Sequence, residues 1–148
     1  MILVVDANVL IGESLRQRGQ QLIKHASLTI HATEKVLDEA GYELPLRIQQ
    51  MILRNRITQE TGNLILQRGI ALINTNVSAY SNDSLLNLEL EAKERIPRDP
   101  DDWQTVALAI VLGAAIWTLD SDFLGCGIPT WTTETLISHL NRYTSTEI

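Results

Sequence analysis

Two short, largely apolar runs, each followed directly by an aspartate, constrain the fold of this 148-residue chain more than any other feature. Residues 2–5 read ILVV and precede Asp6, and residues 114–119 read AAIWTL and precede Asp120. Such runs are typical of strands that are buried on both faces of a parallel sheet. Parallel strands end at a shared edge of their sheet, so we expect Asp6 and Asp120 to lie near each other.

Helical segments separate the strand-like runs. The apolar spacing and the capping residues predict helices at residues 12–24, 33–55, 58–67, 84–95, 102–112 and 133–143. Pro45 is expected to end or kink the second of them, with a further helix continuing from there to about residue 55. Further strands are predicted at residues 28–30 and 129–131, and residues 70–74 fit either a strand or a longer helix. This alternation predicts an α/β fold, a three-layer sandwich with a central parallel β-sheet flanked by helices, in one domain over residues 1–148.

The composition favours a globular protein of a reducing compartment. Hydrophobic residues make up 45% of the chain, and the one cysteine, Cys126, cannot form a disulfide within a monomer. The first residues lack the basic segment of a signal peptide, and no apolar stretch reaches the ~18 residues of a membrane span. We therefore expect a cytoplasmic protein with no membrane partner.

The net charge of −6 argues against a general binder of polyanions, which would normally be basic. That charge falls to −2 if four of the acidic side chains are occupied with divalent cations. An acidic nuclease is therefore compatible with this composition when metal neutralises its site.

Further acids are placed to join Asp6 and Asp120. Asp102 ends the turn-rich segment IPRDPDD and opens a helix, Glu39 lies inside a helix, and Asp122 follows Asp120 by two residues. Singly, Asp102 is an ordinary acid of a helix N-terminus, Asp6 a helix cap and Glu39 a solvated residue. Together, converging carboxylates repel one another unless a cation lies between them. Oxygen ligands alone select Mg²⁺ or Mn²⁺, and the three scattered histidines give no zinc site.

Several segments, taken in order, carry a family resemblance. VVDANVLIG, VLDEA, RDPDDWQTVALAIVLGA, IWTLDSDF and IPTWTTETLISHL resemble the PIN domain family over nearly the whole chain. The resemblance implies a parallel sheet flanked by helices, a Mg²⁺ or Mn²⁺ site and hydrolysis of single-stranded RNA that leaves 5′-phosphate and 3′-hydroxyl ends. Many members are toxins of bacterial toxin–antitoxin pairs of the VapC kind, so an antitoxin protein is an expected partner. Small members commonly form homodimers.

The resemblance also assigns roles by position. The catalytic and metal-binding acids would be Asp6, Glu39, Asp102 and Asp120, with Asp122 as an auxiliary metal ligand. Asp102 is preferred to Asp99 and Asp101 because it lies eleven residues before Gly113, as in the helix of the family.

Polar and basic neighbours complete the expected site. Asn8 and Thr118 would orient carboxylates or water around the metal. Arg98, beside the acidic turn, is the best candidate to contact a substrate phosphate. The arginines at positions 16, 18, 47, 54 and 56 are interpreted mainly as ordinary solvated surface.

Two other functions stay open. A phosphohydrolase of the haloacid dehalogenase type also places an aspartate after its first strand and binds Mg²⁺. It has a second aspartate two residues later, where this chain has Asn8, and no lysine lies close to the later acids. Both features favour the nuclease. The other alternative is an inactive PIN fold that serves as a scaffold or binding module, against which the complete set of acids argues.

Overall fold

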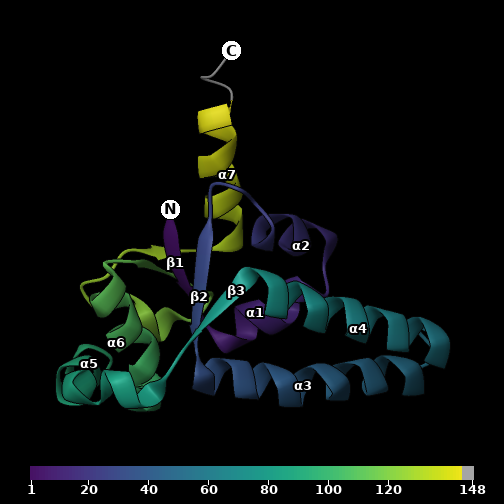
Figure 1. Ribbon diagram of the computed structural model, residues 1–148, viewed down its shortest axis with the longest axis horizontal. Coiled ribbons are helices and arrows are strands. Elements are labelled where there is room, and N and C mark those ends of the chain that lie inside the picture. The colour runs from purple at the N-terminus through teal and green to yellow at the C-terminus, as the bar shows by residue number, and fades with distance from the viewer. Residues whose placement is uncertain (145–148) are drawn as a thin grey trace.

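The computed structural model describes residues 1–144 and has the predicted architecture, a central parallel sheet between layers of helices (Figure 1). Residues 145–148 of the predicted domain lie outside this range. The strands are β1 (Ile2–Val5), β2 (Thr29–Thr33), β3 (Val77–Tyr80), β4 (Ala115–Trp117) and β5 (Thr130–Trp131). The α-helices are α1 (Ala7–Ser14), α2 (Gln17–Ile23), α3 (Glu34–Leu53), α4 (Gln59–Asn76), α5 (Glu89–Arg95), α6 (Trp103–Leu112) and α7 (Thr133–Thr144). Three 3₁₀ turns are η1 (Asn82–Leu88), η2 (Pro100–Asp102) and η3 (Ser121–Phe123).

The order of the strands explains where a site can form. The sheet runs β3-β2-β1-β4-β5, and every neighbouring pair is parallel. The chain therefore builds outward from β1 to β3 on one side and then places β4 and β5 on the other side. The order reverses between β1 and β4, and open α/β sheets hold their ligands in the crevice beyond the strand ends at such a point.

Alternate residues of β1 face the two helical layers. Leu3 and Val5 belong to a core that the sheet shares with α1, α2 and α3, whereas Val4 packs with α5 and α6 on the opposite face. Successive side chains of a strand point to opposite faces, so a strand covered on both sides must be apolar throughout. In Figure 1, α5 and α6 lie on one side of the sheet, while α3 and α4 run antiparallel away from the other.

The prediction of a single helix at residues 12–24 is wrong, because the structure has α1 and α2 in this region. Two helices occupy this region, because the Asp6 side chain accepts a hydrogen bond from the Val9 amide and starts α1 directly after β1. Arg16 has an extended backbone between α1 and α2. The apolar spacing predicted one amphipathic helix because it does not reveal the side-chain cap at Asp6 or the extended backbone at Arg16.

Pro45 does not end the helix in which it lies. Helix α3 continues through it to Leu53. Proline removes the hydrogen bond to the carbonyl four residues earlier, and that residue is Gly41. Gly41 and Pro45 are both exposed, so water can hydrate the free carbonyl, while α3 packs on α1 and α4 along its other side.

The alternative left open for residues 70–74 is decided in favour of helix. Helix α4 extends to Asn76, and the third strand begins at Val77. The helix predicted at residues 84–95 divides into η1 and α5. None of the helices among residues 1–144 is long and apolar enough to cross a membrane.

Candidate metal centre

Asp6 and Asp120 follow strands β1 and β4, between which the strand order of the sheet reverses. Asp6 is buried, with its Oδ1 atom 3.0 Å from the Val9 amide that it caps. The Thr118 hydroxyl donates a short hydrogen bond to the other oxygen of Asp6. The same hydroxyl accepts from the Asp120 amide at 2.9 Å. Thr118 therefore links the side chain of Asp6 to the main chain of Asp120.

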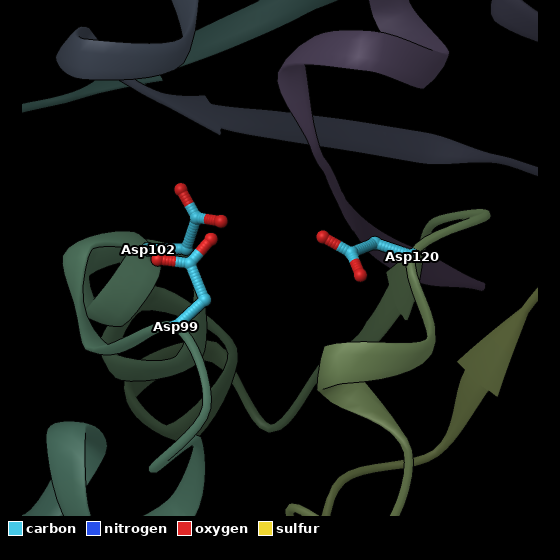
Figure 2. Close-up of side chains that lie close together, drawn as sticks. All are labelled: Asp99, Asp102 and Asp120. Atoms are coloured by element: carbon cyan, nitrogen blue, oxygen red, sulfur yellow. The ribbon is translucent and has the colours of Figure 1, made fainter.

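A 3₁₀ turn adds two more aspartates from the opposite side. Turn η2 begins after Asp99 and ends at Asp102. Side chains three residues apart eclipse in this type of helix, so Asp99 and Asp102 point the same way. Carboxylate oxygens of Asp99, Asp102 and Asp120 all lie within 4.8 Å of one another, and Figure 2 shows Asp99 and Asp102 facing Asp120.

The four acids predicted from the sequence line one small pocket of about 50 Å³. Asn8, Lys35 and Thr105 also line it, and the exposed Glu39 reaches it from the second turn of α3. A pocket of this size has room for an ion and water but is too small for a metabolite. We name this region the acid pocket and include Asp99 in it, because of its closeness to Asp102 and Asp120.

The acid pocket holds more negative charge than its own cations balance. Among the described residues that line it, Lys35 is the one cation, and its Nζ atom lies 3.8 Å from Asp102 Oδ1. Burial, followed by repulsion from Asp99, raises the pKa of Asp102 to about 6. Burial is also the largest cause of the raised pKa of Asp6, to which the charge of Asp120 adds. The ionised forms of Asp6 and Asp102 are thus disfavoured here unless a further cation is bound.

Asp122 and Arg98 pair with each other outside the lining of the acid pocket. Their side chains are 3.3 Å apart, and that of Arg98 is 76% exposed. The Asp122 amide donates to Asp120 Oδ1 at 2.9 Å, so turn η3 positions Asp120 while the Asp122 carboxylate faces Arg98. The Asp122 carboxylate therefore lies outside the group formed by Asp99, Asp102 and Asp120.

Asp99 is the acid that sequence reasoning ranked below Asp102, leaving open whether it also contacts the metal. The spacing to Gly113 favoured Asp102 alone, but the segment DPDD carries a signal for both acids. Proline at the first position of a turn favours a helical start, and a 3₁₀ turn places acids at positions i and i+3 together. That pattern selects Asp99 with Asp102 and turns Asp101 away.

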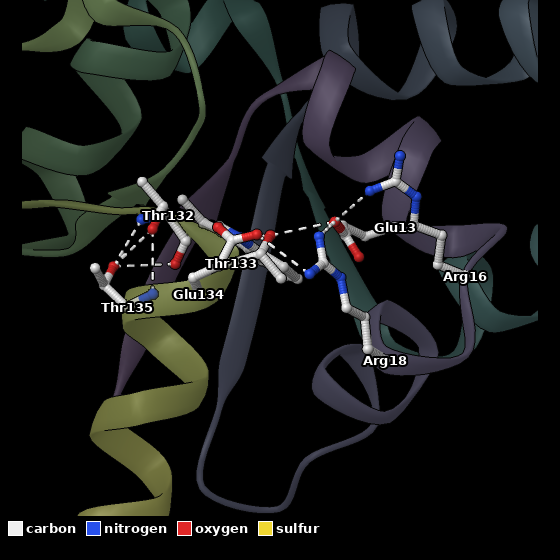
Figure 3. Close-up of polar contacts among 8 residues, drawn as sticks. Glu13, Arg16, Arg18, Thr132, Thr133, Glu134 and Thr135 are labelled. Carbon is white, nitrogen blue, oxygen red and sulfur yellow. Dashed lines mark hydrogen bonds and ion pairs between the residues drawn. The ribbon is translucent and has the colours of Figure 1, made fainter.

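A second buried carboxylate, Glu13, lies at the other end of α1 and has different partners (Figure 3). Its Oε1 atom accepts from Thr133 Oγ1 and from Arg18 Nη2, each at 3.3 Å, and lies 3.6 Å from Arg16 Nη1. Thr133 in turn accepts from the indole of Trp117 at 3.1 Å. Glu13 thereby ties α1 to β4 and to the start of α7.

The donor set of the acid pocket fits a hard divalent cation. Carboxylates supply its charged oxygens, and neither histidine nor cysteine is among the described residues lining it. Mg²⁺ and Mn²⁺ prefer such oxygen ligands, whereas structural zinc prefers nitrogen and sulfur. Asp99, Asp102 and Asp120 are the residues best placed to hold an ion, with Asp6 and Glu39 beside them.

Comparisons with known proteins agree with this architecture. Residues 4–141 match the family model described as a PIN domain. The crystal structure of PAE2754 from Pyrobaculum aerophilum is similar with a TM-score of 0.61 and 16% identity, over 96% of this chain and 90% of that one. The crystal structure of FitAcB from Neisseria gonorrhoeae is similar with a TM-score of 0.57 and 16% identity, over 90% of this chain and 99% of that one. At this identity the two structures support the fold alone. No curated protein sequence matched the chain significantly.

Proposed function

The chain belongs to the PIN domain family, a family of nucleases, and from this membership we propose that it is an endoribonuclease that requires Mg²⁺ or Mn²⁺ and hydrolyses single-stranded RNA. The observation that carries the proposal is the convergence of Asp99, Asp102 and Asp120 at the reversal point of the sheet. Asp6 and Glu39 line the same pocket. We expect products with 5′-phosphate and 3′-hydroxyl ends.

The pocket suits a polymer substrate that lies across its opening. Its volume of about 50 Å³ is far below the ~300 Å³ of a typical pocket for a small molecule. A bound divalent ion would lower the pKa of water and neutralise charge on the phosphoryl oxygens. Asp99, Asp102 and Asp120 would hold the ion. Asp6, oriented by Thr118, would position water for attack in line with the bond that breaks.

The decisive experiment combines metal removal with a matched pair of variants. EDTA should abolish cleavage of a panel of single-stranded RNAs, and Mn²⁺ or Mg²⁺ should restore it, with Zn²⁺ a poor substitute. Asp102→Asn should lower the cleavage rate by at least about 100-fold, because even residues that only support a metal ligand contribute about 10–100-fold. Calorimetry should show weaker Mn²⁺ binding to the same variant.

The control is Asp38→Asn, which removes the same charge from an exposed residue adjacent to Glu39 but outside the acid pocket. It should cut RNA at the rate of the wild type. Equal rates for Asp102→Asn and the wild type would reveal a contaminating ribonuclease and overturn the proposal. Release of phosphate from small phosphomonoesters, without RNA cleavage, would favour the phosphohydrolase instead. A correctly folded protein that binds Mn²⁺ but cuts nothing would favour the scaffold.

We also propose that the chain forms homodimers through α3 and α4. Four large apolar side chains of these helices are exposed, Leu46, Leu53, Leu64 and Ile70. Leu53→Glu should therefore produce a monomer in light scattering, while Leu90→Glu on α5, where the leucine is 80% exposed, should leave the dimer intact. A monomeric wild type at micromolar concentrations would contradict this.

A role as the toxin of a toxin–antitoxin pair is the physiological setting that we propose for this activity. It predicts that a small DNA-binding protein, encoded beside this chain, binds it and suppresses cleavage of RNA. Co-expression of the neighbouring reading frame tests this directly. Unchanged cleavage of RNA in the presence of that protein would count against the pair.

A further inference from the structure

A second pocket, unlike the first, is lined by arginines. It has a volume of about 470 Å³, and Arg16, Arg47, Arg54 and Arg56 line it together with Gly12 and Met51. Its lining contains no aspartate or glutamate. We name it the arginine pocket. Four guanidinium groups around one hollow are unusual in a chain whose net charge is −6.

Three of these guanidinium groups have no partner among the residues that the structure describes. In residues 1–144, no carboxylate lies within ion-pair distance of Arg47, Arg54 or Arg56, and their side chains donate no hydrogen bond. Arg16 lies 3.6 Å from Glu13, which is also paired with Arg18. Like charges held near one another without acids favour the binding of an anion.

The helix dipole explains only part of this arrangement. Arg54 caps the C-terminus of α3, where a cation interacts favourably with the partial negative charge. Arg47 lies nearly two turns earlier, and Arg16 comes from the segment between α1 and α2. These two residues are outside the last turn of α3, so the dipole gives no reason for their position.

The two pockets lie along the same pair of helices. The acid pocket contains Asn8 of α1 and Glu39 of α3, and the arginine pocket contains Gly12 of α1 and Arg47 of α3. Helices α1 and α3 pack together, and a Cβ atom at Gly12 would lie 4.0 Å from Arg47 Nη1. Eight residues of α-helix separate Glu39 from Arg47, which corresponds to about 12 Å. The arginine pocket is therefore within a few nucleotides of the acid pocket.

We propose that the arginine pocket binds the phosphate backbone of single-stranded RNA beside the scissile bond. Planar guanidinium groups bind phosphates through paired hydrogen bonds, independently of base sequence. The strand would run along the α1–α3 seam, with one phosphate at the acid pocket and its neighbours at Arg47 and Arg54. This assignment revises the interpretation of these arginines as ordinary solvated surface. The position of the cleaved bond in this assignment rests on the proposed function, whereas the binding of RNA to the arginine pocket does not.

The test measures RNA binding without cleavage. Fluorescence anisotropy with a labelled oligouridylate, in EDTA and at several salt concentrations, compares the wild type with Arg47→Gln/Arg54→Gln. Binding should weaken at least about 10-fold. The slope of log K against log salt should fall in magnitude by about 1.4, since each phosphate contact on a single strand contributes about 0.7. Arg47→Lys/Arg54→Lys keeps both charges and should retain the slope.

The control is Lys24→Gln/Arg68→Gln, which removes the same charge from a different hollow between α2 and α4. Affinity and slope should stay those of the wild type. An equal loss in both double variants would mean a general electrostatic effect, and an unchanged slope in Arg47→Gln/Arg54→Gln would also overturn the inference. Tighter binding of oligoglutamate than of RNA would assign the pocket to an acidic protein segment.

Cleavage kinetics separate this inference from the proposed function. On a long RNA, Arg47→Gln/Arg54→Gln should raise KM and leave kcat nearly unchanged, whereas a dinucleotide too short to reach the pocket should be cut equally by variant and wild type. If the wild type binds RNA through these arginines but never cuts it, the proposed function fails and the inference stands. If it cuts RNA with no change in KM for the variant, the inference fails alone.

Discussion

Helix α1 has a buried carboxylate at each end, and the two lie in opposite electrostatic surroundings. Glu13, 2% exposed, lies near the C-terminus of the helix, where the dipole disfavours a negative charge, and two arginines and a threonine surround it. Asp6, 7% exposed, caps the N-terminus, where the dipole is favourable, and its charged neighbour is another acid, Asp120. A carboxylate that supports the fold has its counterions within the chain. In the acid pocket this compensation is incomplete, and we propose that a divalent cation completes it.

The largest expected effect on stability comes from crowding the Glu13 end. A Cβ atom at Gly19 would lie 2.2 Å from the main-chain oxygen of Glu13 and 2.5 Å from its Oε2. Gly19→Ala should therefore lower the free energy of unfolding by about 3 kcal/mol, because the main chain must move to accept the methyl group. Urea denaturation measures this. Gly41→Ala, where a Cβ meets no atom within 4 Å, is the control and should be neutral or slightly stabilising.

Removing the charge of Glu13 should have a smaller effect of the same sign. Glu13→Gln keeps the oxygen that accepts from Thr133 but loses the pairing with Arg16 and Arg18. We expect a loss of about 1.5 kcal/mol, the lower end of the range for a hydrogen bond to a charged group. An Arg18→Gln variant should lose less, since its guanidinium is partly exposed. Unchanged stability of Glu13→Gln would mean that the arginines do not stabilise this end.

The same kind of substitution at the other end of α1 should act in the opposite direction. Asp6→Asn keeps a good helix cap and removes a charge whose raised pKa shows that the folded state disfavours it. In EDTA the variant should be more stable than the wild type, by less than about 1 kcal/mol. Mn²⁺ should raise the melting temperature of the wild type by mass action and that of the variant less. A less stable Asp6→Asn in EDTA would contradict the comparison.

The smallest effect is a dependence of stability on pH. The pKa of Asp102 is raised from 3.8 to about 6 in the folded protein, which therefore binds more protons than the unfolded chain between these values. Its contribution to stability is fully present below the ordinary pKa and is lost as the pH rises through about 6. Solvent screening keeps the effect small, because the side chain is 37% exposed. Melting in EDTA from pH 4 to pH 7 measures the slope, which Asp102→Asn should flatten.

Sequence reasoning was accurate where an apolar pattern extends over several residues. It was less accurate where a single hydrogen bond or packing contact determines where a helix begins or ends. The apolar runs of β1 and β4 identify buried strands, and their position fixes the edge at which Asp6 and Asp120 lie. The ends of α1 depend instead on a single hydrogen bond from the Val9 amide. The course of α3 through Pro45 depends on packing against α1 and α4, which local sequence does not encode.

The candidate site shows the same division. Asp6 and Asp120 were predicted because each follows an apolar strand, Asp102 because it opens a helix, and Glu39 from the family resemblance; all four line one pocket. Asp99 required knowledge that residues 100–102 form a 3₁₀ turn. The arginine pocket assembles residues from two separate segments of the chain, so no local pattern predicts it.

The pairing of β1 with β4 determines when the sheet can be completed as the chain is synthesised. Leu3 aligns with Ala115 and Val5 with Trp117, so the centre of the sheet joins residues more than a hundred positions apart. A growing chain can pair β1 with β2 early, but β4 is missing until residue 117 has been made, and Asp120 follows later still. Asp6 and Glu39 are therefore synthesised long before Asp102 and Asp120, the other acids of their pocket. The acid pocket can therefore be complete only after residue 120 has been added to the growing chain.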